Sequence, residues 1–241
     1  MNVAFLFFWC TMILCHLAPN HIYKKVIMSW ILLLWGCVGD STSTEDFVQT
    51  ETLEPLEEIL VGAPASTNTE VYPENVRIIS EDGEDYAWVH ARGYIHQNIK
   101  TVWDALRNDL VYVNQRSVAE YSIDVIESDV FDYVLQENNV VQDIITIEFT
   151  NEWRHLAVEG NKGDPQRVVV RWQKIAGTDF IQLIEGSVEI IRIPNEENIV
   201  EIRVIEHLKA SLDQHDNVLE YVTDLYERWV LVSHGQDIPT Y

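Results

Sequence analysis

The region from Tyr86 to Gly235 is a series of short strand-like segments separated by turn-forming runs, followed by one long amphipathic helix. Apolar and polar residues alternate in these segments, which is the period of a β-strand with one buried face. Strands joined by short turns pair antiparallel. The pattern therefore predicts one antiparallel sheet of seven strands. The expected strands are Tyr86–Ile95, Glu120–Ile126, Phe131–Glu137, Val141–Leu156, Arg167–Ile175, Phe180–Ile193 and Asn198–Lys209.

Two short helices are expected between the first and second strands. Asn98 is a residue type that caps helices, and the apolar residues after it recur at helical spacing. The apolar positions of this first helix are Ile99, Val102, Trp103 and Leu106. The stretch Leu110–Val118 is compatible with a loop or a second short helix.

The last helix has the clearest pattern in the chain. Asp216 or Asn217 is expected to cap it, and Gly235 stands where a helix commonly stops. Its apolar stripe consists of Val218, Val222, Leu225, Trp229 and Val232, widened by Leu219, Tyr226 and Val230. A stripe this broad needs a large apolar partner. The helix should therefore lie across the concave face of the sheet, with Tyr226 and Trp229 either filling the space or bordering a cavity.

Two segments resemble the START/Bet v 1-like (SRPBCC) superfamily, which includes the polyketide cyclase/dehydrase group. One is Ala91–Leu106, where a strand runs into a helix with the core Val-Trp-Asp-Ala-Leu, and the other is Asn217–His234. The resemblance implies an α+β helix-grip fold over residues 76–241, in which a curved sheet encloses a cavity under the terminal helix. It also implies a hydrophobic ligand such as a lipid, a sterol-like molecule or an aromatic compound. The matching residues are structural, and no catalytic residue comes with them.

Nine residues are candidates for lining such a cavity. Five strand positions among them carry a polar or aromatic group, and an Arg or His inside an apolar pocket would orient a ligand. Arg171, Arg203 and His207 could equally lie on the outer face and pair with glutamates of neighbouring strands. Asn151, Trp153 and His155 share one face of a strand, and we expect them to form a hydrated polar row. The nine candidates are Trp103, Trp153, Arg171, Trp172, Arg203, His207, Val222, Tyr226 and Trp229.

The sequence favours a binding protein over an enzyme. It contains no glycine-rich phosphate loop, no His-Glu-x-x-His and no Gly-x-Ser-x-Gly, so we expect no metal, no cofactor and no catalytic residue. The main hypothesis is binding or carriage of a hydrophobic small molecule. Two alternatives stay open: a cyclase-like enzyme with acid–base residues facing the cavity, and an interaction domain of the cell envelope whose core is filled.

The first 37 residues resemble a bacterial lipoprotein signal. Lys24 and Lys25 precede the apolar run Val26–Trp35, and Gly36 then stands before Cys37. This predicts export and lipidation of Cys37, with the domain anchored to a membrane only through this end; an uncleaved anchor is the alternative. Residues 38–75 are acidic and rich in turn formers, so we expect a linker that holds the domain off the membrane.

Charge excludes some classes of partner. The residues after Cys37 contain 14 Lys and Arg against 39 Asp and Glu. Such a surface repels phosphate backbones and anionic headgroups. We therefore expect no nucleic-acid partner and no docking of the domain itself on anionic lipid.

Overall fold

The computed structural model describes residues 41–42, 52–114, 116–142, 145–211 and 213–239. A single antiparallel sheet dominates it, and the order of its eight main strands is β2-β3-β9-β8-β7-β6-β5-β4. The two-residue strand β1 (Ser41–Thr42) pairs with the end of β7. The main strands are β2 (Val76–Asp82), β3 (Ala87–Ile95), β4 (Glu120–Ile126), β5 (Tyr133–Gln142), β6 (Thr146–Asn161), β7 (Asp164–Gly177), β8 (Ile181–Arg192) and β9 (Val200–Ala210).

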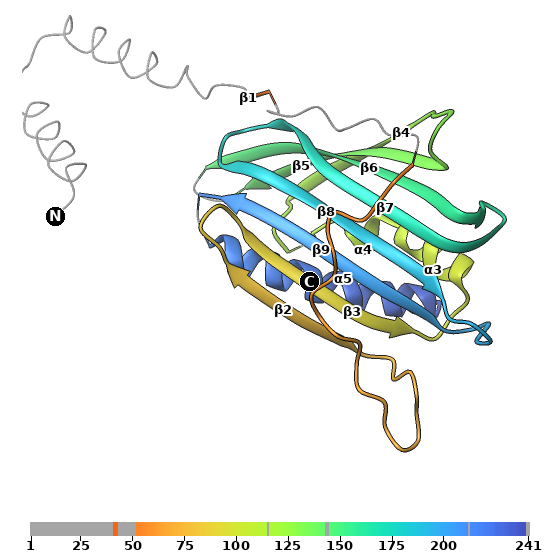
Figure 1. The fold of residues 1–241 in the computed structure, drawn as a ribbon. Helices are drawn as coiled ribbons and strands as arrows, with labels where there is room; N and C mark the ends of the chain where they lie inside the picture. The colour runs from red at the N-terminus through yellow and green to blue at the C-terminus, as the bar shows by residue number, and fades with distance from the viewer. Residues whose placement is uncertain (1–40, 43–51, 115, 143–144, 212, 240–241) are drawn as a thin grey trace, which may run out of the picture. The chain divides into compact units, whose positions relative to one another are not determined.

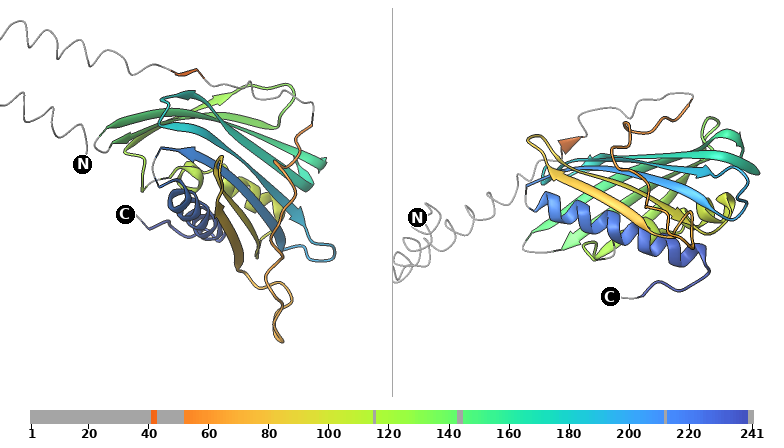
Figure 2. Two further views of the ribbon diagram at one scale, coloured as in Figure 1. Left: turned by 60° about the vertical axis from the view of Figure 1, so that its left-hand side comes forward. Right: turned by 60° about the horizontal axis from the view of Figure 1, so that its bottom comes forward.

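The three helices of the described residues lie on one side of this sheet, and the sheet curls around the longest of them (Figures 1 and 2). They are α3 (Ile99–Leu106), α4 (Asp109–Tyr112) and α5 (Gln214–Ser233). We call the sheet face toward α5 the inner face and the opposite one the outer face. This is the helix-grip arrangement expected from the sequence. Among the described residues no helix combines the length and the apolar character that crossing a bilayer requires.

Helix α3 forms as its sequence predicts. Asn98 accepts a hydrogen bond from the Thr101 backbone N–H at 3.0 Å and so caps the first turn. The apolar face of α3, including Val102 and Trp103, is fully buried. The short α4 follows directly, so the segment predicted as a loop or second helix contains one turn of helix and then an irregular connection.

Helix α5 closes the inner face. Its predicted stripe faces the core, with Val222, Leu225 and Trp229 fully inaccessible to solvent. Val232 and the flanking Leu219 and Val230 are half-buried. The indole N–H of Trp229 donates to the Val102 carbonyl at 2.7 Å, and the Tyr226 hydroxyl donates to the Tyr94 carbonyl at 3.0 Å. These two aromatic residues therefore fasten α5 to α3 and β3 as well as filling space.

The start of α5 differs from the prediction. The helix begins at Gln214, two or three residues before the expected caps, and the preceding Asp213 has a left-handed backbone without a side-chain cap bond. Gln214 provides the reason, since its side chain accepts from the Ala210 N–H and donates to Asp82. Tertiary hydrogen bonds thus fix the first turn. Gly235 does follow the helix with a positive φ of 69°, as a stop glycine should.

Two features of the sheet were wrong in the sequence analysis. The expected strand count of seven missed β2, an edge strand that pairs with β3 along its whole length. The expected strands Phe131–Glu137 and Val141–Leu156 leave Asn138-Asn139 between them as turn formers, but these residues are the middle of β5. Asn138 donates to Asp124 on β4 and accepts from Thr150 on β6, so cross-strand partners replace the local hydrogen bonds that make asparagine a turn former.

Residues 52–61, which we call the strap, also depart from the prediction of a free linker. They cross the outer face over β7, β8, β9 and β3 (Figure 1). Leu53 and Val61 at its two ends are 3% and 4% exposed. The Leu56 N–H donates to Ser187 Oγ at 2.9 Å. Apolar burial and backbone hydrogen bonds therefore hold this acidic segment on the sheet.

Candidate functional site

The inner face of the sheet is apolar near β3 and β8 and becomes polar in its middle and toward β5. Strand alternation places Val89, Val188 and Val204 on this face, all with at most 1% exposure. The same alternation places buried polar side chains there as well. They are Glu137 and Asn139 on β5, Asn151 and His155 on β6, and Glu206 on β9.

Two tryptophans form the centre of this face. Trp153 on β6 and Trp172 on β7 are directly paired across the strands, and their rings stack with centroids 4.4 Å apart. Gly186 on β8 is the cross-strand partner of Trp172 on the other side. A Cβ at Gly186 would lie 2.1 Å from Trp172 Cζ2, so only glycine lets the indole lie over β8.

Glu137 is buried among hydrogen-bond donors. The Trp153 indole N–H donates to Glu137 Oε2 at 3.0 Å. Burial raises the pKa of Glu137 to about 7, while Trp153, Asn139, Asn151 and the charge of Arg228 act in the opposite direction. At neutral pH this carboxyl therefore sits close to the balance between its acid and its ionised form.

Glu206 lies between Val204 and Leu208 along β9 and is 3% exposed. Burial raises its pKa well above 4.5; the Trp172 indole opposes this effect, and the charges of Glu137 and Glu185 add to it. The indole N–H is near the carboxyl but not aligned for a hydrogen bond, because both Trp172 Nε1 and Glu206 Oε2 lack a partner. Glu206 is thus a buried acid with an unused oxygen.

His155 is held as a neutral imidazole. Trp103 Nε1 donates to His155 Nδ1 at 3.2 Å, so the ring proton belongs on Nε2. Burial lowers the pKa of His155 to about 3, with the charge of Arg107 as a smaller cause. His155 Nε2 has no partner. The expected hydrated row of Asn151, Trp153 and His155 is therefore a buried row, and that interpretation was wrong.

Six of the nine sequence-predicted candidates lie on the inner side of the molecule. Trp103, Trp153, Trp172, Val222, Tyr226 and Trp229 all belong to the buried core between sheet and helices. The sequence analysis did not single out Glu137 and Glu206. Their strand parity with Leu135 and Val204 was a usable signal, but an acid in a strand is usually exposed and carries no motif.

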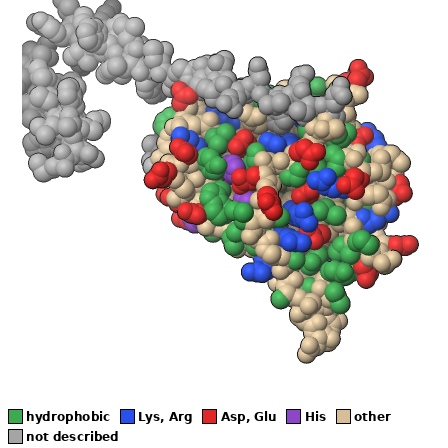
Figure 3. Space-filling view, viewed as in Figure 1, with side chains coloured by type: hydrophobic (Ala, Val, Ile, Leu, Met, Phe, Trp, Pro, Cys, Tyr) green, Lys and Arg blue, Asp and Glu red, His purple; other side chains and the backbone are tan. Residues whose placement is uncertain are grey.

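Arg171, Arg203 and His207 lie on the outer face, so the prediction that they line the interior was wrong. The alternative, cross-strand pairing with glutamates, describes Arg203, whose Nε lies 2.6 Å from Glu201 and whose Nη1 lies 3.4 Å from Glu189. Arg171 donates to the Gly186 and Glu54 carbonyls. Figure 3 shows acidic and basic side chains interspersed over this face.

His207, His90 and Glu57 meet where the strap crosses β9 and β3. Glu57 Oε1 lies 2.8 Å from His90 Nε2 and 3.3 Å from His207 Nε2, and Glu185 holds the other nitrogen of His207 at 3.1 Å. One ligand atom from each of Glu57, His90 and His207 would fit around a metal ion. However, Leu60 N–H donates to His90 Nδ1, which puts the His90 proton on Nε2. With the strap in place this nitrogen donates a hydrogen bond and cannot coordinate a metal.

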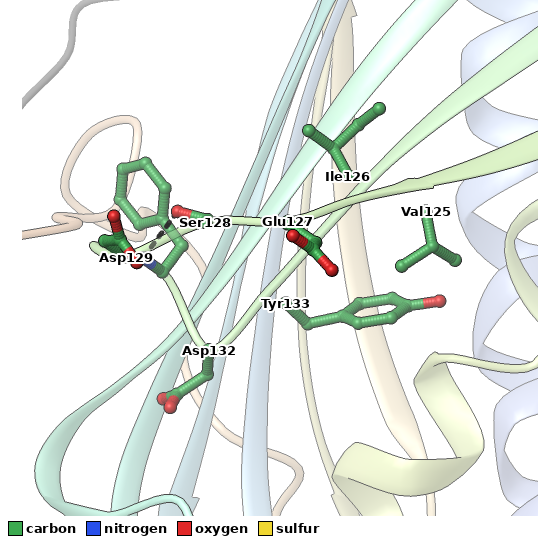
Figure 4. A pocket seen from close by; sticks show the side chains of 8 residues that line it. Val125, Ile126, Glu127, Ser128, Asp129, Asp132 and Tyr133 are labelled. Carbon is green, nitrogen blue, oxygen red and sulfur yellow. Dashed lines mark hydrogen bonds between the residues drawn. The ribbon is translucent and has the colours of Figure 1, made fainter.

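A separate hollow of about 590 Å³ lies at the β4–β5 connection (Figure 4). Val125 and the Tyr133 ring lie on one side of the hairpin, and Ile126 points the other way. Asp132 is already used, since Oδ2 accepts from the Ala157 N–H and its carbonyl accepts from Lys162. The hollow is an acidic surface depression and is distinct from the inner face.

Comparison with solved structures gives similar folds at low identity. Human StAR-related lipid transfer protein 5 matches with a TM-score of 0.48 and 10% identity, over 68% of this chain and 84% of that one. The lipid transfer and protein localization domain of human StarD13 matches with a TM-score of 0.45 and 9% identity, over 90% and 98%. The Zhui aromatase/cyclase from Streptomyces sp. R1128 matches with a TM-score of 0.37 and 9% identity, over 67% and 93%.

These proteins come from the groups that the sequence resembles. At 9–10% identity the similarity shows the fold alone. No protein-family model and no curated protein matches the sequence.

Proposed function

We propose that the domain binds a small, largely apolar molecule between the inner face of the sheet and α5. The observation that carries this proposal is a set of buried polar atoms without hydrogen-bond partners on an otherwise apolar face. They are Asn139 Oδ1, Asn151 Oδ1, His155 Nε2, Trp172 Nε1 and Glu206 Oε2.

Such atoms are costly in a closed core. A buried donor or acceptor left without a partner costs about 1–3 kcal/mol, and native proteins contain few of them. Their grouping on β5, β6, β7 and β9 favours a common partner that satisfies several at once. Because Trp153, Trp172 and aliphatic residues surround them, that partner would be apolar over most of its surface.

One observation favours the alternative of an interaction domain with a filled core. Trp103, Trp153, Trp172 and Trp229 are fully buried and occupy much of the volume under α5. In that case the unpartnered atoms would be satisfied by trapped water. The cyclase alternative needs acid–base residues that face the interior. The four residues considered for that role, Glu201, Arg203, His207 and Arg171, lie on the outer face, whereas Glu137, His155 and Glu206 lie on the inner face.

Native mass spectrometry of the full chain, purified without added ligand, distinguishes a ligand-binding domain from an interaction domain with a filled core. We expect a non-covalent mass excess of a few hundred daltons that is lost on denaturation, and an extract containing an apolar compound. A folded mass equal to that of the polypeptide, together with no uptake of dodecanol, would contradict the proposal and favour the filled core.

We also propose that this binding takes place outside the cytoplasm, on a domain anchored through Cys37. The support is the sequence pattern of residues 1–37, which lie outside the described residues. An exported carrier of this kind would meet apolar molecules at a membrane surface and hold them away from water.

A further inference from the structure

Glu206 differs from three other buried charged groups in how its charge is balanced. Arg154, Glu189 and Asp224 are buried too, but each has a charged partner: Glu152 for Arg154, Arg167 and Arg203 for Glu189, and Arg116 for Asp224. The groups that act on Glu206 are the Trp172 indole and two further acids. It is therefore a carboxyl without a cation, with one oxygen unused.

Besides Arg154, two described cations are buried, Arg228 and Lys174. Lys174 donates to the Thr178 and Ile181 carbonyls, and the hydrogen bonds of Arg228 are also made away from Glu206. Arg228 on α5 donates from Nε to the Asp224 carbonyl and from Nη1 to the Val113 carbonyl, and its charge acts on Glu137. An anionic ligand would have to displace these contacts. A cationic ligand would not need Arg228.

The unpartnered atoms of the inner face point to the same chemistry. Three of the five are acceptors: Glu206 Oε2, Asn139 Oδ1 and Asn151 Oδ1. The amide nitrogens of both asparagine side chains point toward Glu137, so their side-chain oxygens are left without a hydrogen-bond partner. The aromatic faces of Trp153 and Trp172 are further sites that attract a cation.

We propose that the molecule bound under α5 carries a protonated amine on an apolar body, and that Glu206 binds this amine as its carboxylate counter-ion. The inference rests on the proposed function and names the chemical class of its ligand. Trp172 supplies the aromatic wall beside the ion pair, because Gly186 lets its ring lie next to Glu206.

The proton balance follows from the surroundings of Glu206. In the free protein the Glu206 carboxyl lies near Trp172 and, on α5, Tyr221, and the charges of Glu137 and Glu185 act on it. Burial raises its pKa and so favours its protonated form. An alkylammonium ion entering at pH 6.5 brings its own positive charge. Glu206 then gives its proton to solvent, so binding releases up to one proton per molecule.

The test compares three probes of equal chain length on the full chain at pH 6.5: dodecylammonium, dodecanol and dodecanoate, all below their micellar concentrations. Titration calorimetry in two buffers of different ionisation enthalpy measures affinity and proton release together. We expect dodecylammonium to bind at least tenfold more tightly than either other probe, with proton release. Glu206→Gln should bring it to within about twofold of dodecanol and abolish the release.

Glu201→Gln is the matched control. It removes a negative charge from the same strand, but on the outer face, where Glu201 pairs with Arg92 and Arg203. It should leave the preference for the amine intact.

Equal binding of amine and alcohol, or tightest binding of dodecanoate, would overturn the inference while leaving the proposed function in place. Absence of binding by all three probes would overturn the inference, and with an empty native mass spectrum it would overturn the proposed function too.

Discussion

At the scale of single residues, the inner face combines acids and a histidine whose protonation is set by burial. The pKa of Glu137 is raised to about 7 and that of His155 is lowered to about 3, so the two groups affect stability with opposite signs. Stability linked to Glu137 is present below pH 4.5 and is lost as pH rises through 7. Stability linked to His155 is present above pH 6.5 and is lost as pH falls toward 3.

Replacing Glu137 should therefore change the pH dependence of stability. Glu137→Gln keeps the shape and the hydrogen bond with Trp153 but cannot ionise. The free energy of unfolding of the wild type should fall between pH 5 and pH 8, because Glu137 ionises there. The variant should not show this fall, so its free energy of unfolding relative to wild type should rise by on the order of 1–2 kcal/mol from pH 5 to pH 8. Urea unfolding at the two pH values measures this. Glu152→Gln, on the outer face of β6, is the control. If Glu137→Gln differed from wild type by the same free energy at pH 5 and at pH 8, the proposed ionisation of Glu137 would be contradicted.

Gly186 is the residue on which the position of Trp172 depends. Gly186→Ala would place a Cβ inside the indole, so the ring must move and the stack with Trp153 must open. We expect a loss of roughly 1–3 kcal/mol of stability, as for other overpacked cores. Near-ultraviolet circular dichroism should report the altered tryptophan environment. Unchanged stability and an unchanged spectrum would show that the ring does not lie over β8.

At the scale of elements, most of the fold could be predicted from the sequence because local patterns agreed with the tertiary structure. Strand β4 has the predicted bounds, and five residues of the predicted α5 stripe are buried: Val218, Val222, Leu225, Tyr226 and Trp229. The failures lie where tertiary contacts override local preference. Asn138 and Asn139 continue β5 because neighbouring strands supply their hydrogen bonds, and Gln214 starts α5 early because Asp82 and Ala210 hold its side chain.

The candidate site was less predictable than the fold. Parity along a strand shows which residues share a face, but it does not show which face meets α5. On β9 both faces carry buried apolar residues: Ile205 is buried on the outer face and Val204 on the inner face. The apolar pattern of β9 therefore does not distinguish its two faces. The strap is the reason, because an acidic segment that looked like a linker buries part of the outer face.

Hydrogen exchange tests whether the strap is an element of the fold. Its Leu56 and Leu60 amides donate to Ser187 Oγ and His90 Nδ1, so they should exchange slowly, whereas the exposed Ala65 and Ser66 should exchange fast. Ser187→Ala removes the acceptor of Leu56 and should speed its exchange by at least tenfold. Ser128→Ala, in the β4–β5 connection, should have no effect there. Fast exchange throughout residues 52–61 in the wild type would restore the linker interpretation.

At the scale of the whole molecule, export and anchoring through Cys37 are a prediction from the sequence of residues 1–37. Metabolic labelling with a radioactive fatty acid in a bacterial host should label the full chain through Cys37, and Cys37→Ala should lose the label. Cys15→Ala is the matched control and should retain it. Equal labelling of wild type and Cys37→Ala would rule out lipidation at this residue and favour an uncleaved anchor or a secreted form.

The central claim is that an apolar molecule binds between α5 and the inner face of the sheet. Intermolecular nuclear Overhauser effects on the full chain with dodecanol test it most directly, because they report protons in contact. The account predicts contacts from the chain methylene groups to the Trp172 indole N–H and to the Val204 and Val222 methyl groups. Contacts confined to the hollow around Val125 and Ile126, or no contacts at all, would contradict it.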